Sequence, residues 1–461
     1  MNTNQKGIKK ALLNCNVSQV LESRPFFIWK EKSLYSCWLN HSFPQEHLRT
    51  LQGNKISILS SGKRNELEGP DFSDALILID DQFFRGDVEI HLESKNWYIH
   101  KHHEDPVYNS TILHVVLKGD PNLKITTQDG KSVPTLVLLN CKELDENESF
   151  RCEEWKGVKW IGLCEVLMNY SQIRFQRKCL TVQSDLMQID PEQYFYKGLS
   201  EVLGYSRNRE AFKSLADKLP ISMVYDILSD NDSEKLIILE SLYFGTAGFL
   251  NSNYQRFVSD SKYLDGLKEK WCRLSREFDV EIDKSFRWHF AGSRPVNHPT
   301  YRIAALVQII YKMFPDFPGQ LWINQMGSER SLDEVIQWTR SYFQQPCGMW
   351  KNHPFFAFHP ARLLIGNARL MDICTNLLFP FSWAIGSIKK KEKIMTRSTE
   401  FAKKIGKGEI PSSVQKMLSR LSIPSSKLST NCLIQGAIEF LRRFCDLKLC
   451  KLCPLEQHVY K

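Results

Sequence analysis

The sequence has no hydrophobic run long enough to cross a membrane as a helix, which takes roughly 18 to 20 apolar residues. The longest candidate, LLFPFSWAIGSI, is short and is interrupted by Pro380. The residues up to Phe27 contain no uninterrupted apolar core and no small-residue cleavage site, so no signal peptide is predicted. We therefore expect a cytoplasmic protein that has no membrane partner.

Motifs that bind nucleotide phosphates are also missing. The chain has no Walker A sequence and no GxGxxG after a strand, and Ser61-Gly62-Lys63 lacks the rest of a P-loop. A GxSxG nucleophile elbow is absent as well. These absences count against enzymes that use a nucleotide cofactor and against serine hydrolases.

The composition is that of an ordinary globular protein, with 461 residues, 42% of them hydrophobic and 25% charged. Apolar runs of strand length dominate the first third of the chain, and helical periodicity follows it. The predicted fold class is therefore an α/β domain followed by a larger all-helical domain. The predicted divisions are an extension at 1–25, an α/β domain at 26–142, an acidic linker at 143–160, a helical domain at 161–388 and a basic helical segment at 389–461.

The segment GPDFSDALILIDDQFFRGDVEIHLE, residues 69–93, predicts two strands at Phe72–Ile79 and Phe83–Glu93. Because side chains alternate between the faces of a strand, one face of the second strand carries charged and ligand-type residues. These residues are Arg85, Asp87, Glu89, His91 and Glu93. Asp71, before the first strand, can join them across the hairpin. Crowded carboxylates repel one another unless a cation is present, so a divalent metal site is predicted. A solvated strand face is the alternative.

Asp71 and Glu89-Ile90-His91 resemble the motif of the PD-(D/E)XK nuclease superfamily, which has a restriction-endonuclease-like fold. That core consists of a helix, a three-stranded meander, a second helix and a further strand. Its counterparts here would be a helix at 44–51, strands at 55–60, 72–79 and 83–93, a crossover at 94–109 and a strand at 111–118. The resemblance implies that Asp71 and Glu89 hold Mg²⁺ or Mn²⁺, with Asp87 as an additional carboxylate. His91 stands where the superfamily usually has lysine, and it would orient or deprotonate the attacking water.

A second resemblance spans most of the chain. The strings NELEGPDFSDA, GDVEIHLESKNW, HKHHEDPVYNSTILHVV, ESLYFGTAGFL, SRPVNHPTYRIA and RRFCDLKLCKLCP resemble one uncharacterised bacterial family, catalogued as a domain of unknown function. It implies no activity. Three hypotheses therefore stand. The first is a metal-dependent nuclease or nuclease-derived nucleic-acid-binding protein, and the second is a non-catalytic scaffold. The third is a transition-metal hydrolase built on His91, His100, His102 and His103.

Positive charge is concentrated at the end of the chain. Residues 389–461 contain 16 lysines and arginines against 6 acidic residues, a net charge of +10, whereas the whole chain has +9. Such a segment suits the phosphate backbone of a nucleic acid, either DNA or RNA. The predicted contacts are Lys389, Lys390, Lys391, Lys393, Arg442 and Arg443. Charge that only maintains solubility is the alternative.

Three of the thirteen cysteines lie close together near the end of the chain, at Cys445, Cys450 and Cys453, and a proline follows the last one. Clustered thiols without an export signal usually hold zinc or an iron–sulfur cluster. A fourth ligand is then needed. His458 is within easier reach than Cys432, which a helix would separate from Cys445 by roughly 18 to 20 Å. The alternative is a group of free thiols.

Overall fold

The computed structural model describes most of the chain in two compact units, Met1–Glu146 and Asn147–Lys461. The described residues are 31–40, 43, 48–65, 68–80, 82–138, 152, 155, 157–230, 234–250, 261–282, 288–290, 298–346, 362–446, 450 and 453–459. The division between the units lies within the acidic stretch 143–160.

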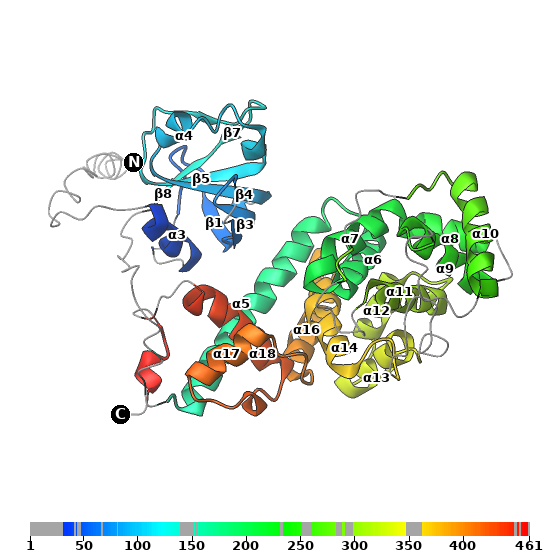
Figure 1. Cartoon of the computed structure of the whole chain (residues 1–461). Coiled ribbons are helices and arrows are strands. Elements are labelled where there is room, and N and C mark those ends of the chain that lie inside the picture. The colour runs from blue at the N-terminus through cyan, green and yellow to red at the C-terminus, as the bar shows by residue number, and fades with distance from the viewer. Residues whose placement is uncertain are drawn as a thin grey trace, which may run out of the picture. The chain divides into compact units, whose positions relative to one another are not determined.

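Unit 1 is built on a six-stranded sheet with the order β1-β3-β4-β5-β8, in which β2 pairs with β3 (Figure 1). The strands are β1 (Ile56–Ser60), β2 (Lys63–Arg64), β3 (Phe72–Ile79), β4 (Gln82–Glu93), β5 (Thr111–Lys118) and β8 (Thr135–Val137). The pairs β1–β3 and β3–β4 are antiparallel, whereas β4–β5 and β5–β8 are parallel. The four longer strands agree with the predicted strands within one residue at each end.

The helix before the sheet does not lie where the sequence predicted it. Residues 48–50 are not helical, because Arg49 forms a β-bridge with Lys55, and residues 44–47 lie outside the described part. The described helix that precedes β1 is α3 (Glu31–Asn40). Its buried Leu34, Cys37 and Trp38 are fully removed from solvent, so α3 contributes to the core of unit 1.

The connection from β4 to β5 consists of two short helices, α4 (Asn96–Ile99) and η1 (Pro106–Ser110). Trp97 on α4 and Tyr108 on η1 pack against a small hairpin made of β6 (Ile125–Thr126) and β7 (Ser132–Val133). The Trp97 indole also donates a hydrogen bond of 2.9 Å to the carbonyl of Thr126. This packing fixes the connection above the sheet.

Unit 2 is helical. Its helices up to residue 343 are α5 (Trp160–Asp185), α6 (Pro191–Leu203), α7 (Tyr205–Lys218), α8 (Ile221–Ser229), α9 (Lys235–Thr246), α10 (Ser261–Glu277), α11 (Pro299–Met313), α12 (Pro318–Gly327) and α13 (Leu332–Phe343). Those that follow are α14 (Asn367–Ile373), η6 (Cys374–Leu378), α15 (Phe379–Ile388), α16 (Glu392–Lys404), α17 (Ser412–Arg420), η7 (Ser425–Lys427), α18 (Asn431–Phe440), η8 (Leu441–Cys445) and η10 (Glu456–His458). None of the helices in the described part is both long and apolar enough to span a membrane.

The sequence predicts most of these helices because their ends carry recognisable signals. The Asp190 side chain accepts hydrogen bonds from the amides of Glu192 and Gln193, and a proline occupies the first position of α6. The basic C-terminal segment does not stand apart from unit 2, since α18 lies along α5 (Figure 1). Helix α16 also packs against α15.

Candidate metal centre

One face of β4 carries Glu89 and His91, which lie two residues apart and are 5% and 1% exposed. Strand β5 runs parallel to β4 and pairs His114 directly with Glu89, so His114 lies on the same face. His114 is fully buried, and its Nε2 is 2.9 Å from Nδ1 of His91. The sheet therefore fixes three ligand-type side chains through its strand register alone.

Asp71 is held beside this face by the pairing of β3 with β4. Its amide donates a hydrogen bond of 3.0 Å to Oε2 of Glu89, and its own Oδ2 accepts one of 2.9 Å from the amide of Ile90. The hydroxyl of Tyr35, on α3, also bonds to the Asp71 carboxylate. The exposed Arg64 guanidinium lies 5.2 Å from the centre of the Tyr35 ring. The half-buried Asp71 and the buried Glu89 are thus bordered by the exposed Arg64.

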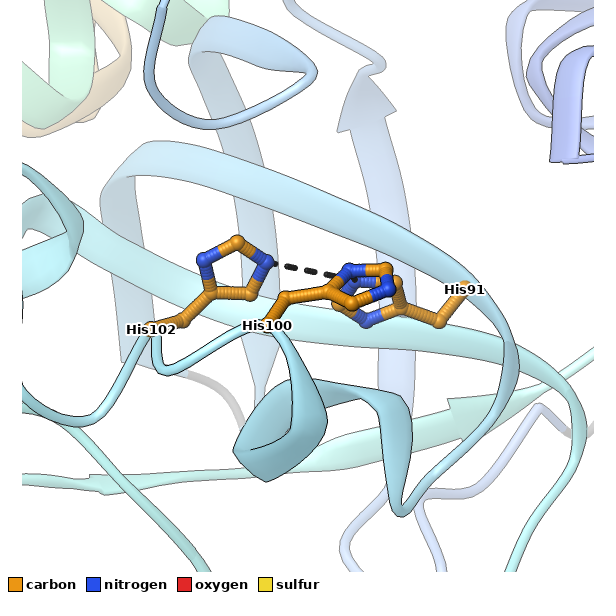
Figure 2. Close-up of side chains that lie close together, drawn as sticks. All are labelled: His91, His100 and His102. Atoms are coloured by element: carbon orange, nitrogen blue, oxygen red, sulfur yellow. Dashed lines mark hydrogen bonds between the residues drawn. The ribbon is translucent and has the colours of Figure 1, made fainter.

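Two further histidines reach the site from the turn that follows α4. Figure 2 shows His100 and His102 extending from this turn toward His91. His102 is 8% exposed, and its ring stacks on Tyr108 with the ring centres 3.9 Å apart, whereas His100 is exposed. The turn thus covers the sheet face, and the histidine cluster meets solvent on the His100 side.

Four side-chain atoms converge at this point: Nε2 of His91, Nδ1 of His100, Nε2 of His102 and Oε1 of Glu89. The His91 nitrogen lies 3.1 Å from that of His100 and 3.3 Å from that of His102. The Glu89 oxygen lies 3.3 Å from the His91 nitrogen and 3.2 Å from the His102 nitrogen. The nitrogens of the three histidines all lie within 4.8 Å of one another.

These separations suit a metal ion better than they suit hydrogen bonds. An imidazole nitrogen has one hydrogen or one lone pair in the ring plane, so it forms one good hydrogen bond. The His91 nitrogen has three neighbours within 3.3 Å. In a tetrahedral zinc site with Zn–N distances of about 2.0 to 2.1 Å, neighbouring ligand atoms lie about 3.3 to 3.4 Å apart. The four measured separations are close to that value, although only the three histidine nitrogens, without the Glu89 oxygen, form a group whose atoms all lie within 4.8 Å of one another.

The electrostatics of the site also favour a cation. The pKa of His91 is lowered to about 2, mainly by burial and also by the neighbouring His114, His102 and His100. Burial likewise lowers the pKa of His114 to about 3 and raises that of Glu89 to about 8. The imidazoles of His91 and His114 are therefore neutral at pH 7, so that a ring nitrogen of His91 has a lone pair available to a metal. A divalent cation would in turn favour the ionised carboxylate of Glu89.

Some residues on the predicted strand face lie away from this cluster. Asp87 accepts hydrogen bonds from the Asp74 amide and the Ser110 hydroxyl, and Glu93 pairs with Lys95. A register irregularity in the β4–β5 pairing lies between Asp87 and Val88, and it separates Asp87 from Glu89. His103 lies apart as well, with its ring 4.7 Å from that of Tyr98.

The predicted nucleic-acid contacts lie in two places in unit 2. Lys389, Lys390 and Lys391 are exposed where α15 leads into α16. Lys393 forms an ion pair with Glu329, and Arg443 is paired with the buried Glu439. Arg442 is half-buried on η8. The three lysines at the turn are thus the part of this set most open to a phosphate backbone.

The predicted C-terminal ligands also separate. Cys445, Cys450 and Cys453 line one small cavity, whereas Cys432 donates a hydrogen bond to Ser171 elsewhere on α18. His458 is not among the residues that line the cavity, and its ring lies against Gly162 on α5.

Sequence reasoning did not select His114 or Tyr35. His114 lies within the apolar run TILHVVLK, and a single histidine in such a run is usually a buried core residue. Its position directly opposite Glu89 becomes informative only once the parallel register of β4 and β5 is known. Tyr35 belongs to a helix that was not predicted.

Comparison with known proteins identifies a family but no activity. No curated protein and no solved structure matches the chain. Residues 31–409 match a family described as protein of unknown function (DUF2851), and this range includes the whole histidine and carboxylate cluster. It ends before Cys445. Because the match covers most of the sequence, the chain belongs to the DUF2851 family of proteins of unknown function.

Proposed function

We propose that unit 1 binds one transition-metal ion through His91, His100, His102 and Glu89 and uses it to hydrolyse phosphodiester bonds. The observation that carries this proposal is the convergence of three imidazole nitrogens and one carboxylate oxygen, with separations of 3.1 to 3.3 Å. Three imidazoles suit Zn²⁺, Mn²⁺ or Fe²⁺, whereas Mg²⁺ prefers oxygen ligands. The proposal therefore moves the ion from the Asp71–Glu89 pair toward the histidines.

The order of elements supports the phosphodiester substrate. A helix, three antiparallel strands, a helical crossover and a parallel strand follow one another as α3, β1, β3, β4, α4 with η1, and β5. This order resembles the PD-(D/E)XK core, with Asp71 before the second long strand and Glu89 and His91 on the third. The exposed Arg64, next to Tyr35 and Asp71, is placed to contact a phosphate.

The ion and the two residues next to its ligands would each have a role in hydrolysis. The ion would polarise the scissile phosphate and lower the pKa of a bound water. In the tautomer that metal binding requires, Nδ1 of His91 would donate a hydrogen bond to Nε2 of His114, which leaves Nε2 of His91 as the ligand atom. Asp71 lies beside Glu89, where its carboxylate can accept a proton from the attacking water.

The arrangement also supports a second function, a structural metal site in a non-catalytic scaffold. If Glu89 joined the three histidines as a ligand, four protein ligands would close the site, and closed sites of this kind are typically structural, whereas catalytic zinc keeps one position for water. The 1% exposure of His91 favours the same reading. The two functions differ in whether Glu89 binds the ion directly or lies beside a metal-bound water.

Metal analysis and a cleavage assay on the full chain test the proposal. We expect about one equivalent of metal bound by the histidine cluster, and cleavage of single- or double-stranded DNA or RNA stimulated by Mn²⁺ or Zn²⁺. Glu89→Gln should abolish cleavage in either geometry, because it removes the carboxylate charge. Metal binding without cleavage of any of these substrates would support the scaffold, and the lack of both would contradict the metal centre itself.

A further inference from the structure

A small cavity in unit 2 lies between the C-terminal cysteines and a residue that precedes α5. Four cysteines line this cavity, and they come from two distant stretches of the chain: Cys152, Cys445, Cys450 and Cys453. Apolar side chains form most of the remaining wall: Trp155, Met417, Leu421, Phe440, Phe444 and Leu455. Arg420 is the one charged residue in this lining. The cavity therefore combines thiols with a dry, apolar surrounding.

The four thiols are close enough to interact with one another. Burial raises the pKa of Cys445, and the thiols of Cys453, Cys152 and Cys450 raise it further. Cys453 experiences the same effect, mainly from burial and also from Cys450 and Cys152. Cys152 thus belongs to the group although 292 residues separate it from Cys445 in the sequence.

The backbone explains how this distant cysteine reaches the others. Val158 forms an antiparallel β-bridge with Val459, and the amide of Lys159 donates a hydrogen bond of 2.9 Å to the carbonyl of His458. The residues that lead into α5 therefore run beside the end of the chain. Cys152 precedes Val158 in the chain and Cys453 precedes Val459, so the bridge between these valines brings both cysteines to the cavity.

We propose that Cys152, Cys445, Cys450 and Cys453 hold an iron–sulfur cluster, with Cys152 as the fourth ligand in place of His458. Four cysteine thiolates are the usual ligands of such clusters. A cluster with four thiolates carries negative charge, which the Arg420 guanidinium partly balances from the cavity wall. The apolar wall keeps water from the cluster.

The spacing of the thiols distinguishes a cluster from a single zinc ion. In the described part of the chain, the three histidines of unit 1 form the group of potential ligands whose atoms all lie within 4.8 Å, and no three of the four thiols do. Zinc with four cysteines requires thiols about 3.8 Å apart, since Zn–S is about 2.3 Å. Thiolates that bind separate irons of a cluster lie farther apart than this.

The cluster's role would be to connect the two ends of unit 2. Cys152 lies before α5, and the other three cysteines follow α18, which packs along α5. Joining them closes a loop that includes most of unit 2, and such closure reduces the entropy of the unfolded chain. We therefore expect the cluster to stabilise unit 2, independently of any reaction in unit 1.

The test uses the full chain, purified without oxygen and reconstituted with ferrous iron and sulfide. We expect acid-labile sulfide with iron in at least equal amount, because the histidine cluster of unit 1 can take up one further iron. We also expect visible absorption from thiolate–iron charge transfer, and iron–iron distances in X-ray absorption spectra of the wild type. These measurements need no variant. One equivalent of tightly bound zinc without iron uptake, or uptake of neither metal, would overturn the cluster.

Three variants test the ligand assignment. Cys152→Ser should lose most of the iron and the visible absorption, whereas Cys432→Ser should retain both, because Cys432 is a buried cysteine that does not line this cavity. His458→Ala should also retain the iron. Full iron content in Cys152→Ser, or its loss in His458→Ala with the helical circular dichroism intact, would overturn the assignment of Cys152.

Discussion

Glu89 in unit 1 and Glu439 in unit 2 are both buried glutamates, 5% and 1% exposed, yet their pKa values shift in opposite directions. Burial raises the pKa of Glu89 to about 8. Burial also acts to raise that of Glu439, but Arg177, Arg174 and Arg443 outweigh it and lower the pKa to about 2. The difference lies in the partners that each carboxylate has.

The partners of Glu439 are permanent cations. Its oxygens lie 2.7 Å from the Arg177 guanidinium, 3.4 Å from that of Arg174 and 3.0 Å from that of Arg443. In the described part of unit 1, the ion-pair partners of Glu89 are His91 and His102, whose pKa values are lowered. A carboxylate that the protein neutralises itself is typical of structure. One that is surrounded by neutral nitrogen ligands is suited to an added metal ion.

The largest effect is expected when the neutralised carboxylate is removed. Glu439→Gln leaves three arginines without their shared counter-charge in a buried site, which should cost about 3 to 5 kcal/mol in the free energy of unfolding. Denaturant unfolding measures this loss. The matched control is Glu329→Gln, an exposed glutamate paired with Lys393, which should change stability little. Equal effects of the two substitutions would contradict the structural role of Glu439.

Acid should reveal the same ion pairs. The pKa of Glu439 is about 2 in the folded state, against an ordinary value of 4.5, so its contribution is fully present above pH 4.5. It is lost progressively as the pH falls from 4.5 toward 2, by about 3 kcal/mol in total. The free energy of unfolding of wild type should therefore fall more steeply below pH 4.5 than that of Glu439→Gln. Parallel pH profiles would refute this contribution.

Removing a ligand from the histidine cluster should weaken metal binding in unit 1 and leave the iron content of unit 2 unchanged. His91→Ala deletes the nitrogen that approaches both His100 and His102, so zinc affinity should fall by at least about 100-fold. His103→Ala is the matched control, because His103 lies on the same turn outside the cluster. Zinc titration with a competing chelator measures the change. The iron content of unit 2 should remain unaltered in both variants, and a comparable loss of zinc affinity in both would exclude this ligand set.

The sequence predicted the sheet well because each strand carries a local signal. Phe72–Ile79 and Thr111–Lys118 are apolar runs that the structure reproduces residue for residue. Asp71 and Glu89 meet because the second and third long strands pair directly, which a hairpin pattern already indicates. Such contacts follow from neighbouring segments and need little knowledge of tertiary structure.

Other parts of the sites depend on packing that no local pattern records. The contact of His114 with His91 requires the parallel register of β4 and β5. Cys152 reaches the other cysteines because Val158 pairs with Val459, although these two residues lie near opposite ends of unit 2 in the sequence. His458 seemed the easier ligand from its sequence distance alone, yet its ring is directed against α5. Sequence proximity is thus a poor guide to a fourth ligand.

The smallest expected effect concerns nucleic-acid binding by unit 2, which would be separable from chemistry in unit 1. Lys390 and Lys391 are exposed at the turn before α16, so each can contact a phosphate. Each lost contact should reduce the slope of log affinity against log salt concentration by about 0.7 to 0.9. Reversing both lysines to glutamate should therefore flatten the salt dependence.

Reversing Lys218 and Lys262, which are exposed on α7 and α10, changes the net charge equally and should have less effect. Binding measured by fluorescence anisotropy over a salt series distinguishes the pairs. Identical slopes for both double variants would show that the basic segment acts only through its contribution to the net charge. Local phosphate contacts would then be excluded.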